Sequence, residues 1–161
     1  MKTPFSILFA MVLAGCHNAA SRDVDSPFFS IPAGSSLTLH KELPIPERQR
    51  HVKLQHGKPM AGVNEFKVNC QMRVYDLGVD AIHPDQFRIK RTGEGREWES
   101  RPYVLRFFRI LHLESEKQPW VIKLICQRLA GPDWARNVSV PEMREAVGDY
   151  VTFDFPTGLA H

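Results

Sequence analysis

The sequence predicts a mainly β domain, either an antiparallel sandwich or a barrel-like sheet, with one short helix near the C-terminal end. Apolar and polar residues alternate in several short segments, which is the period of a strand with one buried face. Turn residues separate these segments at the spacing typical of sandwiches and barrels, so about seven strands are expected. The segments are residues 36–40, 50–55, 66–75, 87–91, 103–113, 120–129 and 150–155.

The clearest predicted strand is residues 66–75, where Phe66, Cys70 and Val74 share one face with other apolar residues and polar side chains occupy the opposite face. Residues 103–113 are apolar on both faces, which favours a central strand that contains a bulge. Residues 92–96 contain two glycines and predict a turn or a mobile hairpin tip.

The predicted helix follows Ser139, which is a suitable N-cap because Glu142 stands three residues later and completes a capping box. Met143 and Val147 supply a narrow apolar stripe, and Gly148 suits the position after the last turn. We expect this helix to close one end of the domain. An exposed surface that the helix shares with Trp134 is the alternative.

The chain has 161 residues and a formal net charge of +3, which suits one compact domain and supports neither a nucleic-acid binder nor a polybasic membrane patch. Apart from the first residues, no segment is long and apolar enough to predict a membrane-spanning helix. We expect a single β-rich domain over residues 37–161.

The N-terminal residues carry one cation, Lys2, then an apolar run that ends in Leu13-Ala14-Gly15-Cys16. This pattern resembles a bacterial lipoprotein precursor, whose lipobox has this form. The resemblance implies that residues 1–15 are a signal peptide and that Cys16 becomes the first mature residue, acylated on its thiol and its amine. An ordinary secretory signal followed by a chance cysteine is the alternative.

Residues 16–36 are predicted to be a tether, because their composition buries too little apolar surface to offset the entropy of ordering. Phe28, Phe29 and Ile31 are exceptions that could dock onto the domain. The residue after the acylated cysteine is His17 and not aspartate, so the resemblance implies the outer membrane if the source is Gram-negative. The chain also resembles small cysteine-paired envelope proteins that have no assigned activity.

Cys70 and Cys126 remain once Cys16 is assigned to the lipid. Both share strand parity with apolar residues, so both are expected to face the core. Export to an oxidising periplasm would let them form a disulfide, across one sheet or between two packed sheets. Two unrelated buried thiols are the alternative.

Motifs that would indicate catalysis or metal binding are weak. The seven histidines include no tight metal-ligand motif. His40 and His51 would lie together if their strands paired, and only the turn after His51 could bring His56 close to it. No nucleophile elbow and no phosphate-binding glycine loop is present, so no cofactor or metal is expected. An enzyme whose site is assembled from distant residues is kept as the alternative function.

Basic residues near aromatic ones form a candidate binding face. Arginine and aromatic side chains are common at binding hot spots, and this face could contact an anionic polymer, lipid headgroups or an acidic envelope protein. A solvated outer face of the sheet is the alternative. The candidate residues are Arg88, Lys90, Arg91, Arg106 and Arg109.

The sequence therefore predicts a monomeric or weakly associating envelope domain that is held by a lipid anchor and has a binding or structural role, with an unidentified partner.

Overall fold

The structure, a computed structural model, describes residues 21–32, 34–134 and 136–156. One antiparallel sheet of eight strands has the order β10-β1-β7-β8-β9-β5-β3-β4, and β2 and β6 form a separate two-stranded sheet. The elements are β1 Ser36–Leu39, β2 Leu43–Pro44, β3 His51–Gln55, β4 Lys58–Met60, β5 Asn69–Val74, β6 Ala81–Ile82, β7 Asp85–Trp98, β8 Leu105–Glu114, β9 Val121–Ala130, α1 Val140–Val147, the 3₁₀ turn η1 Gly148–Tyr150, and β10 Val151–Asp154.

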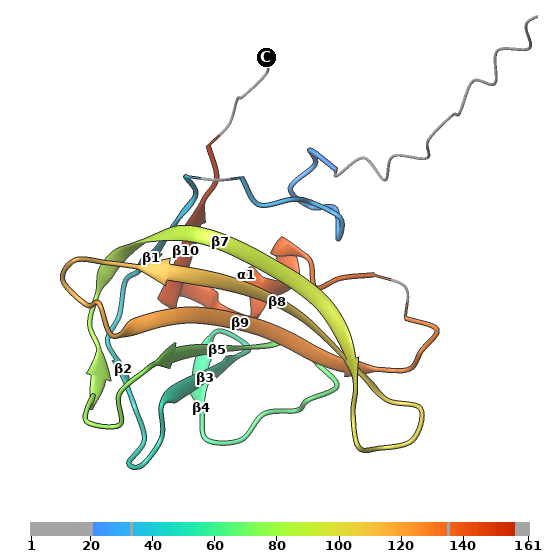
Figure 1. Ribbon diagram of the computed structural model, residues 1–161, viewed down its shortest axis with the longest axis horizontal. Helices are drawn as coiled ribbons and strands as arrows, with labels where there is room; N and C mark the ends of the chain where they lie inside the picture. Colours follow the sequence, from blue (N-terminus) through green and yellow to red (C-terminus); the bar gives the residue numbers. More distant parts are fainter. Residues whose placement is uncertain (1–20, 33, 135, 157–161) are drawn as a thin grey trace, which may run out of the picture.

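The large sheet curls into a half-barrel, which confirms the mainly antiparallel fold in its barrel-like form (Figure 1). Helix α1 lies behind strands β7, β8 and β9 in this view, on the concave side of the sheet. It contacts β3 and β5 towards one edge and β10 at the other edge. The helix therefore occupies the concave side of the half-barrel instead of closing one end of the domain, while its predicted apolar stripe faces the core.

The core lies between the concave face and α1. Inward residues of β8 such as Leu111 and Leu113 alternate with partly exposed outward residues, so the predicted period of two is visible in the burial of the strand. From the helix, Met143 and Val147 are fully buried in the same cluster. The convex face of the sheet is left to solvent.

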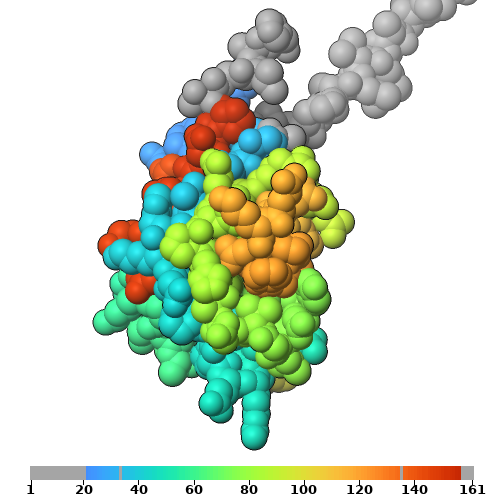
Figure 2. Space-filling model, turned by 90° about the vertical axis from the view of Figure 1, so that its left-hand side faces the viewer, coloured from blue at the N-terminus to red at the C-terminus, as the bar shows by residue number. Residues whose placement is uncertain are grey.

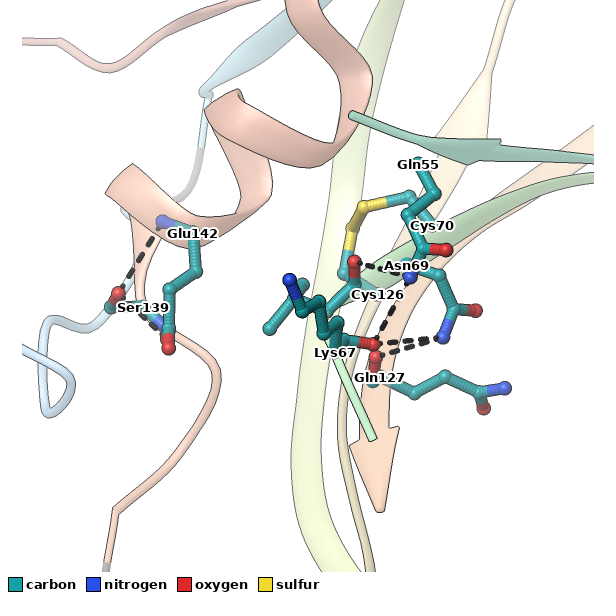
Figure 3. Close-up of a disulfide and its surroundings, with 9 residues drawn as sticks. Gln55, Lys67, Asn69, Cys70, Cys126, Gln127, Ser139 and Glu142 are labelled. Atoms are coloured by element: carbon teal, nitrogen blue, oxygen red, sulfur yellow. Dashed lines mark hydrogen bonds between the residues drawn. A yellow bond between two sulfur atoms is a disulfide. The ribbon is translucent and has the colours of Figure 1, made fainter. Parts of the chain in front are cut away.

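The predicted helix start is confirmed. The Ser139 backbone N–H donates to the Glu142 carboxylate at 2.9 Å, and the Ser139 hydroxyl accepts from the Glu142 backbone N–H (Figure 3). This capping box satisfies two N–H groups that a helix start leaves without intrahelical partners. Gly148 follows the last helical residue with a positive φ, as predicted.

The prediction of a turn at residues 92–96 is wrong, because this segment lies within the long strand β7. Both glycines face the convex side, opposite Ile110 and Phe108 of β8. A Cβ atom at Gly95 would lie 3.1 Å from Cζ of Phe108, so the ring covers this glycine. Gly95 therefore makes room for a cross-strand side chain, and neither glycine reverses the chain.

Two strand starts are also later than predicted. β5 begins at Asn69, because Asn64 holds the preceding segment in a turn in which its side-chain oxygen accepts the Phe66 N–H at 3.0 Å. Gln55 anchors this turn by accepting from the Asn64 N–H and donating to its carbonyl, both at 2.9 Å. β8 begins at Leu105, since Tyr103 has a positive φ and lies 80% exposed in the β7–β8 connection.

Part of the predicted tether packs on the domain. Phe29 and Ile31 are buried, and the Phe29 ring centroid lies 5.5 Å from that of Phe155, whereas Phe28 is exposed. The Pro27 carbonyl accepts a hydrogen bond from Arg109 of β8.

Candidate functional site

Five basic residues form one continuous row across five neighbouring strands. Arg91 of β7 stands opposite His112 of β8, His112 opposite Lys123 of β9, Lys123 opposite Arg73 of β5, and Arg73 opposite His51 of β3. We call these five residues the cationic row.

A bulge in β7 brings Arg91 into this row. The β7–β8 register passes from Ile89 opposite Leu113 to Arg91 opposite His112, so Lys90 is the extra residue. In a regular strand Arg91 would share the inward parity of Ile89. The bulge instead puts Lys90 and Arg91 on the outside together, and both are exposed.

The other four members occupy outward positions and are partly exposed, and the β5–β9 register shifts only after the Arg73–Lys123 pair. Their inward neighbours, such as Met72 and Leu124, are fully buried. The cationic row therefore lies on the convex face, away from the core and from α1. Because adjacent strands are about 4.8 Å apart, five strands place the outer members about 19 Å from each other.

The charges of the row are not neutralised within the described part of the chain. None of the ion pairs formed by residues 21–32, 34–134 and 136–156 includes a row member. Lys53, two residues after His51 on the same face of β3, also makes no ion pair in this part. Like charges directly opposite each other in a sheet are destabilising. The arrangement therefore costs stability in the free protein.

Both histidines titrate in this positive field. Burial lowers the pKa of His112 below its usual value, and Arg91 and Lys123 on the two flanking strands lower it further. Burial also lowers the pKa of His51, with additional contributions from Lys53 and Arg73. The row consequently carries its fixed charges on two arginines and one lysine at neutral pH, and both rings become cationic only in more acidic solution.

Of the candidate face expected from the sequence, only Arg91 belongs to this row. Arg88 and Lys90 both pair with Glu114, which lowers the pKa of that carboxyl group. Arg106 points outward but pairs with Glu97 and Glu99.

Arg109 occupies an inward position and its side chain is only 2% exposed. It donates to Glu94 at 2.7 Å and to the Pro27 carbonyl. Because Arg109 is covered on the concave side, it does not belong to an accessible face. The structure thus divides the five candidate residues between two faces of the sheet and ties four of them to carboxylates.

The residues that sequence reasoning left out of the candidate site are Arg73, Lys123, His112 and His51. Alternation in each strand indicates that a residue such as Arg73 points outward. Which outward residues stand side by side depends on the register of four strand pairs and on one bulge. No single segment contains that information.

A partly exposed apolar strip borders the row. In the next register row, Ile125 of β9 stands opposite Ile110 of β8, which stands opposite Gly93 of β7. A Cβ atom at Gly93 would meet nothing within 4 Å, so the sheet surface is open there.

The predicted disulfide is confirmed (Figure 3). Cys70 and Cys126 are directly opposite in the β5–β9 pair, their Cα atoms lie 4.0 Å apart, and both are fully buried. The bridge therefore runs across one sheet and joins the two strands that hold Arg73 and Lys123. Cys16, the predicted lipidation site, lies outside the described residues.

A second polar cluster joins the β8–β9 turn to the start of β7, at the end of the molecule that Figure 2 shows. Ser115 donates to Asp85 at 2.6 Å, and Gln118 donates to the same carboxylate and to the His83 carbonyl. Burial opposes ionisation of Asp85, but these hydrogen bonds and one from the Gln86 N–H outweigh it and lower the pKa of the carboxyl group.

This cluster is not a nucleophile with a base. The Ser115 hydroxyl points at a carboxylate, the third partner is an amide, and the ring of His83 instead contacts Glu42. An open groove of about 1100 Å³ lies beside it, and its lining includes Arg88, Lys90 and Lys117. The cluster fixes the turn. It does not provide a catalytic site for the alternative function as an enzyme.

Metal ligands do not gather within the described ranges, where no group of three or more histidine, cysteine, aspartate or glutamate side chains could hold an ion. His40 and His51 are not neighbours, because β1 pairs with β7 and β10 and not with β3. Trp134 packs against a small apolar cluster, and the Cζ atoms of Arg128 and Arg136 lie 3.8 and 4.5 Å from its ring centroid. The cluster consists of Leu105, Phe107 and Ala130.

Comparison of the chain with protein-family models, with curated proteins and with solved structures found no match. In the described part of the chain, no helix has both the length and the apolar character required to cross a membrane.

Proposed function

We propose that this chain is a lipid-anchored, non-catalytic binding domain of the cell envelope and that the cationic row is its contact with an anionic component. The observation that carries the binding role is the row itself: five basic residues in register, without a carboxylate partner among the described residues. An exposed sheet face that has no ligand gains nothing from such an arrangement, since the opposed charges weaken the fold.

The anchoring part of the proposal rests on the Leu13-Ala14-Gly15-Cys16 motif. A buried disulfide agrees with export, because disulfides persist in oxidising compartments. His17 after the acylated cysteine favours the outer membrane in a Gram-negative cell, where a periplasm-facing domain meets anionic envelope components. The domain is proposed to act as a monomer.

Anchoring is tested with Cys16→Ser. Two acyl chains bury tens of methylenes at about 0.8 kcal/mol each, whereas a protein whose full chain has a net charge of only +3 has little else to hold it on a membrane. The unchanged chain is expected in the membrane fraction, with the mass of a diacylated N-terminal peptide, and the variant in the soluble fraction. A variant that stays wholly with washed membranes, or an N-terminal peptide without acyl chains, would contradict the anchor.

The binding role is tested separately, with the full chain that carries Cys16→Ser. We expect washed envelopes to retain this protein at low salt and to release it as salt screens the charges. Adding Arg73→Gln and Lys123→Gln should abolish retention. The matched control is Lys58→Gln with Arg144→Gln, which removes the same charge from two exposed residues outside the row and outside the described ion pairs. Equal loss in both pairs of variants would show that net charge, and not the row, causes retention.

A further inference from the structure

The cationic row runs across the strands, in the direction in which the half-barrel curls. Its members therefore follow a curved line with one basic group about every 4.8 Å. A flat bilayer would reach the middle of such a line before its ends. A flexible chain of anionic groups can bend with the surface and contact all five side chains.

Among the residues that the structure describes, no strand flanks either end of the row. β1 pairs with β7 only at Asp85–Arg88 and not beside Arg91. β4 pairs with β3 only at Lys53–Gln55 and not beside His51. A ligand longer than the row can therefore extend past either end, whereas a small anion would find no wall to enclose it.

The surroundings of the row indicate what the anionic chain lacks. The register row on one side of the cationic row contains Ile110, Ile125 and Gly93, and none of these can stack on a nucleic-acid base. On the other side, Tyr75 lies two residues after Arg73 and is 57% exposed, but it is a single ring. Single-stranded nucleic acids are usually held by several aromatic side chains on which successive bases stack. The basic groups of the row therefore supply most of the recognition.

We propose that the cationic row binds a flexible linear polyanion that lies across β7, β8, β9, β5 and β3. This inference rests on the proposed binding role and names the kind of partner. Arg91, Lys123 and Arg73 hold successive anionic groups at three points along the chain. Their guanidinium and ammonium donors form charge-assisted hydrogen bonds to phosphate or carboxylate oxygens.

The two histidines supply a signature of this binding mode. His112 lies between Arg91 and Lys123, and His51 lies beside Arg73 and Lys53, so protonation is suppressed in the free protein. An anionic chain laid along the row removes this suppression, and the rings become additional donors. Binding along the whole row therefore takes up protons in mildly acidic solution, through His51 and His112.

The test uses the full chain with Cys16→Ser and three probes: inorganic phosphate, tripolyphosphate and long-chain polyphosphate. Affinity is expected to increase from the first probe to the last, since only a chain that spans about 19 Å contacts the whole row. Calorimetry in buffers of different ionisation enthalpy should show proton uptake on binding at pH 6. Replacing both histidines with Gln should abolish this uptake while the protein still binds at pH 8.

Arg73→Gln with Lys123→Gln should raise the dissociation constant for long-chain polyphosphate at least about tenfold, because two charge-assisted contacts disappear. It should also reduce the slope of log affinity against log salt by about two, one for each cation lost. The Lys58→Gln and Arg144→Gln control should keep the affinity within a small factor.

The outcomes separate the two proposals. If envelopes retain the protein through the row but long polyphosphate binds no better than phosphate, the linear polyanion is wrong and the binding role stands. Tighter binding to vesicles of phosphatidylcholine and phosphatidylglycerol in equal parts than to long-chain polyphosphate would show that the row binds a lipid surface and not a flexible chain. If neither envelopes nor polyphosphate depend on Arg73 and Lys123, both proposals fail.

Discussion

Gly57 and Gly148 lie backbone against backbone where the β3–β4 turn meets the end of helix α1. The Gly57 N–H donates to the Ala146 carbonyl at 3.1 Å, and both glycines have positive φ angles. A Cβ atom at Gly148 would lie 2.4 Å from the Gly57 Cα atom. This contact attaches the helix to the β3–β4 end of the half-barrel.

Gly148→Ala is therefore expected to destabilise the domain. Its backbone angles, φ 57° and ψ −139°, lie in a region that only glycine adopts readily, which by itself costs about 1–3 kcal/mol, and the new methyl group would collide with Gly57. Gly62→Ala is the control, since a Cβ atom there meets nothing within 4 Å. Thermal unfolding should show a clear decrease in Tm for the first variant only. Equal Tm values for the two variants would mean that the Gly57–Gly148 contact can open without loss of stability.

The Cys70–Cys126 disulfide should contribute strongly to stability. It closes a loop with a sequence separation of 56 residues, for which the loss of unfolded-state entropy corresponds to about 4 kcal/mol in the chain-entropy model. Reduction of the exported protein should lower the denaturant midpoint substantially. Thiol labelling of unfolded, unreduced protein should modify neither residue. Labelling of both would show that the bridge is absent from the exported protein.

Lys123→Gln should stabilise the fold and weaken ligand binding in the same protein. Lys123 stands directly opposite Arg73, so its removal relieves a like-charge pair, an effect of about 0.2–1 kcal/mol. The free energy of unfolding is measured at low salt and again at high salt, where screening should erase the gain. Lys58→Gln, which removes a charge outside the row, should change stability little. A loss of stability in Lys123→Gln would show that this side chain supports the sheet.

Stability of the free domain should decrease on acidification in two ranges. Burial and neighbouring cations lower the pKa of His51 and His112, so the unfolded chain binds protons first and the folded state loses stability as the pH falls through about 6.5. Hydrogen bonds from Arg88 and from Lys41 lower the pKa of Glu114 and Asp149 respectively. Their stabilisation is present at neutral pH and is lost as the pH falls below about 4.

Polyphosphate should reverse the loss of stability that begins at about pH 6.5, because a bound anion raises the pKa of both histidines and stabilises the protonated row. Urea unfolding between pH 8 and pH 5, with and without long-chain polyphosphate, checks this. Replacing His51 and His112 with Gln should remove the decrease near pH 6.5 and leave the decrease at lower pH. If this variant still loses stability near pH 6.5, groups other than His51 and His112 cause the loss.

Local sequence determined much of the scaffold. The capping box of Ser139 and Glu142 is complete within four residues, and alternation within β5 and β9 was sufficient to turn both cysteines inward. Short-range patterns succeed here because a helix cap and a strand face depend on neighbours in the chain. Local pattern also misled at Gly93 and Gly95, which lie inside β7, and the reason for a glycine at position 95 is the Phe108 ring of the next strand.

The candidate site was decided by tertiary structure alone. Arg88, Lys90 and Arg109 looked equivalent to Arg91 in sequence, but carboxylates on neighbouring strands pair with all three. Alternation in the sequence determined which side chains point outward in regular strand segments such as β9, but not at Arg91 or Arg109. Only the register of five strands, with the bulge at Lys90, decided which basic groups stand together, because cross-strand neighbours are set by pairing between segments that are distant in the chain.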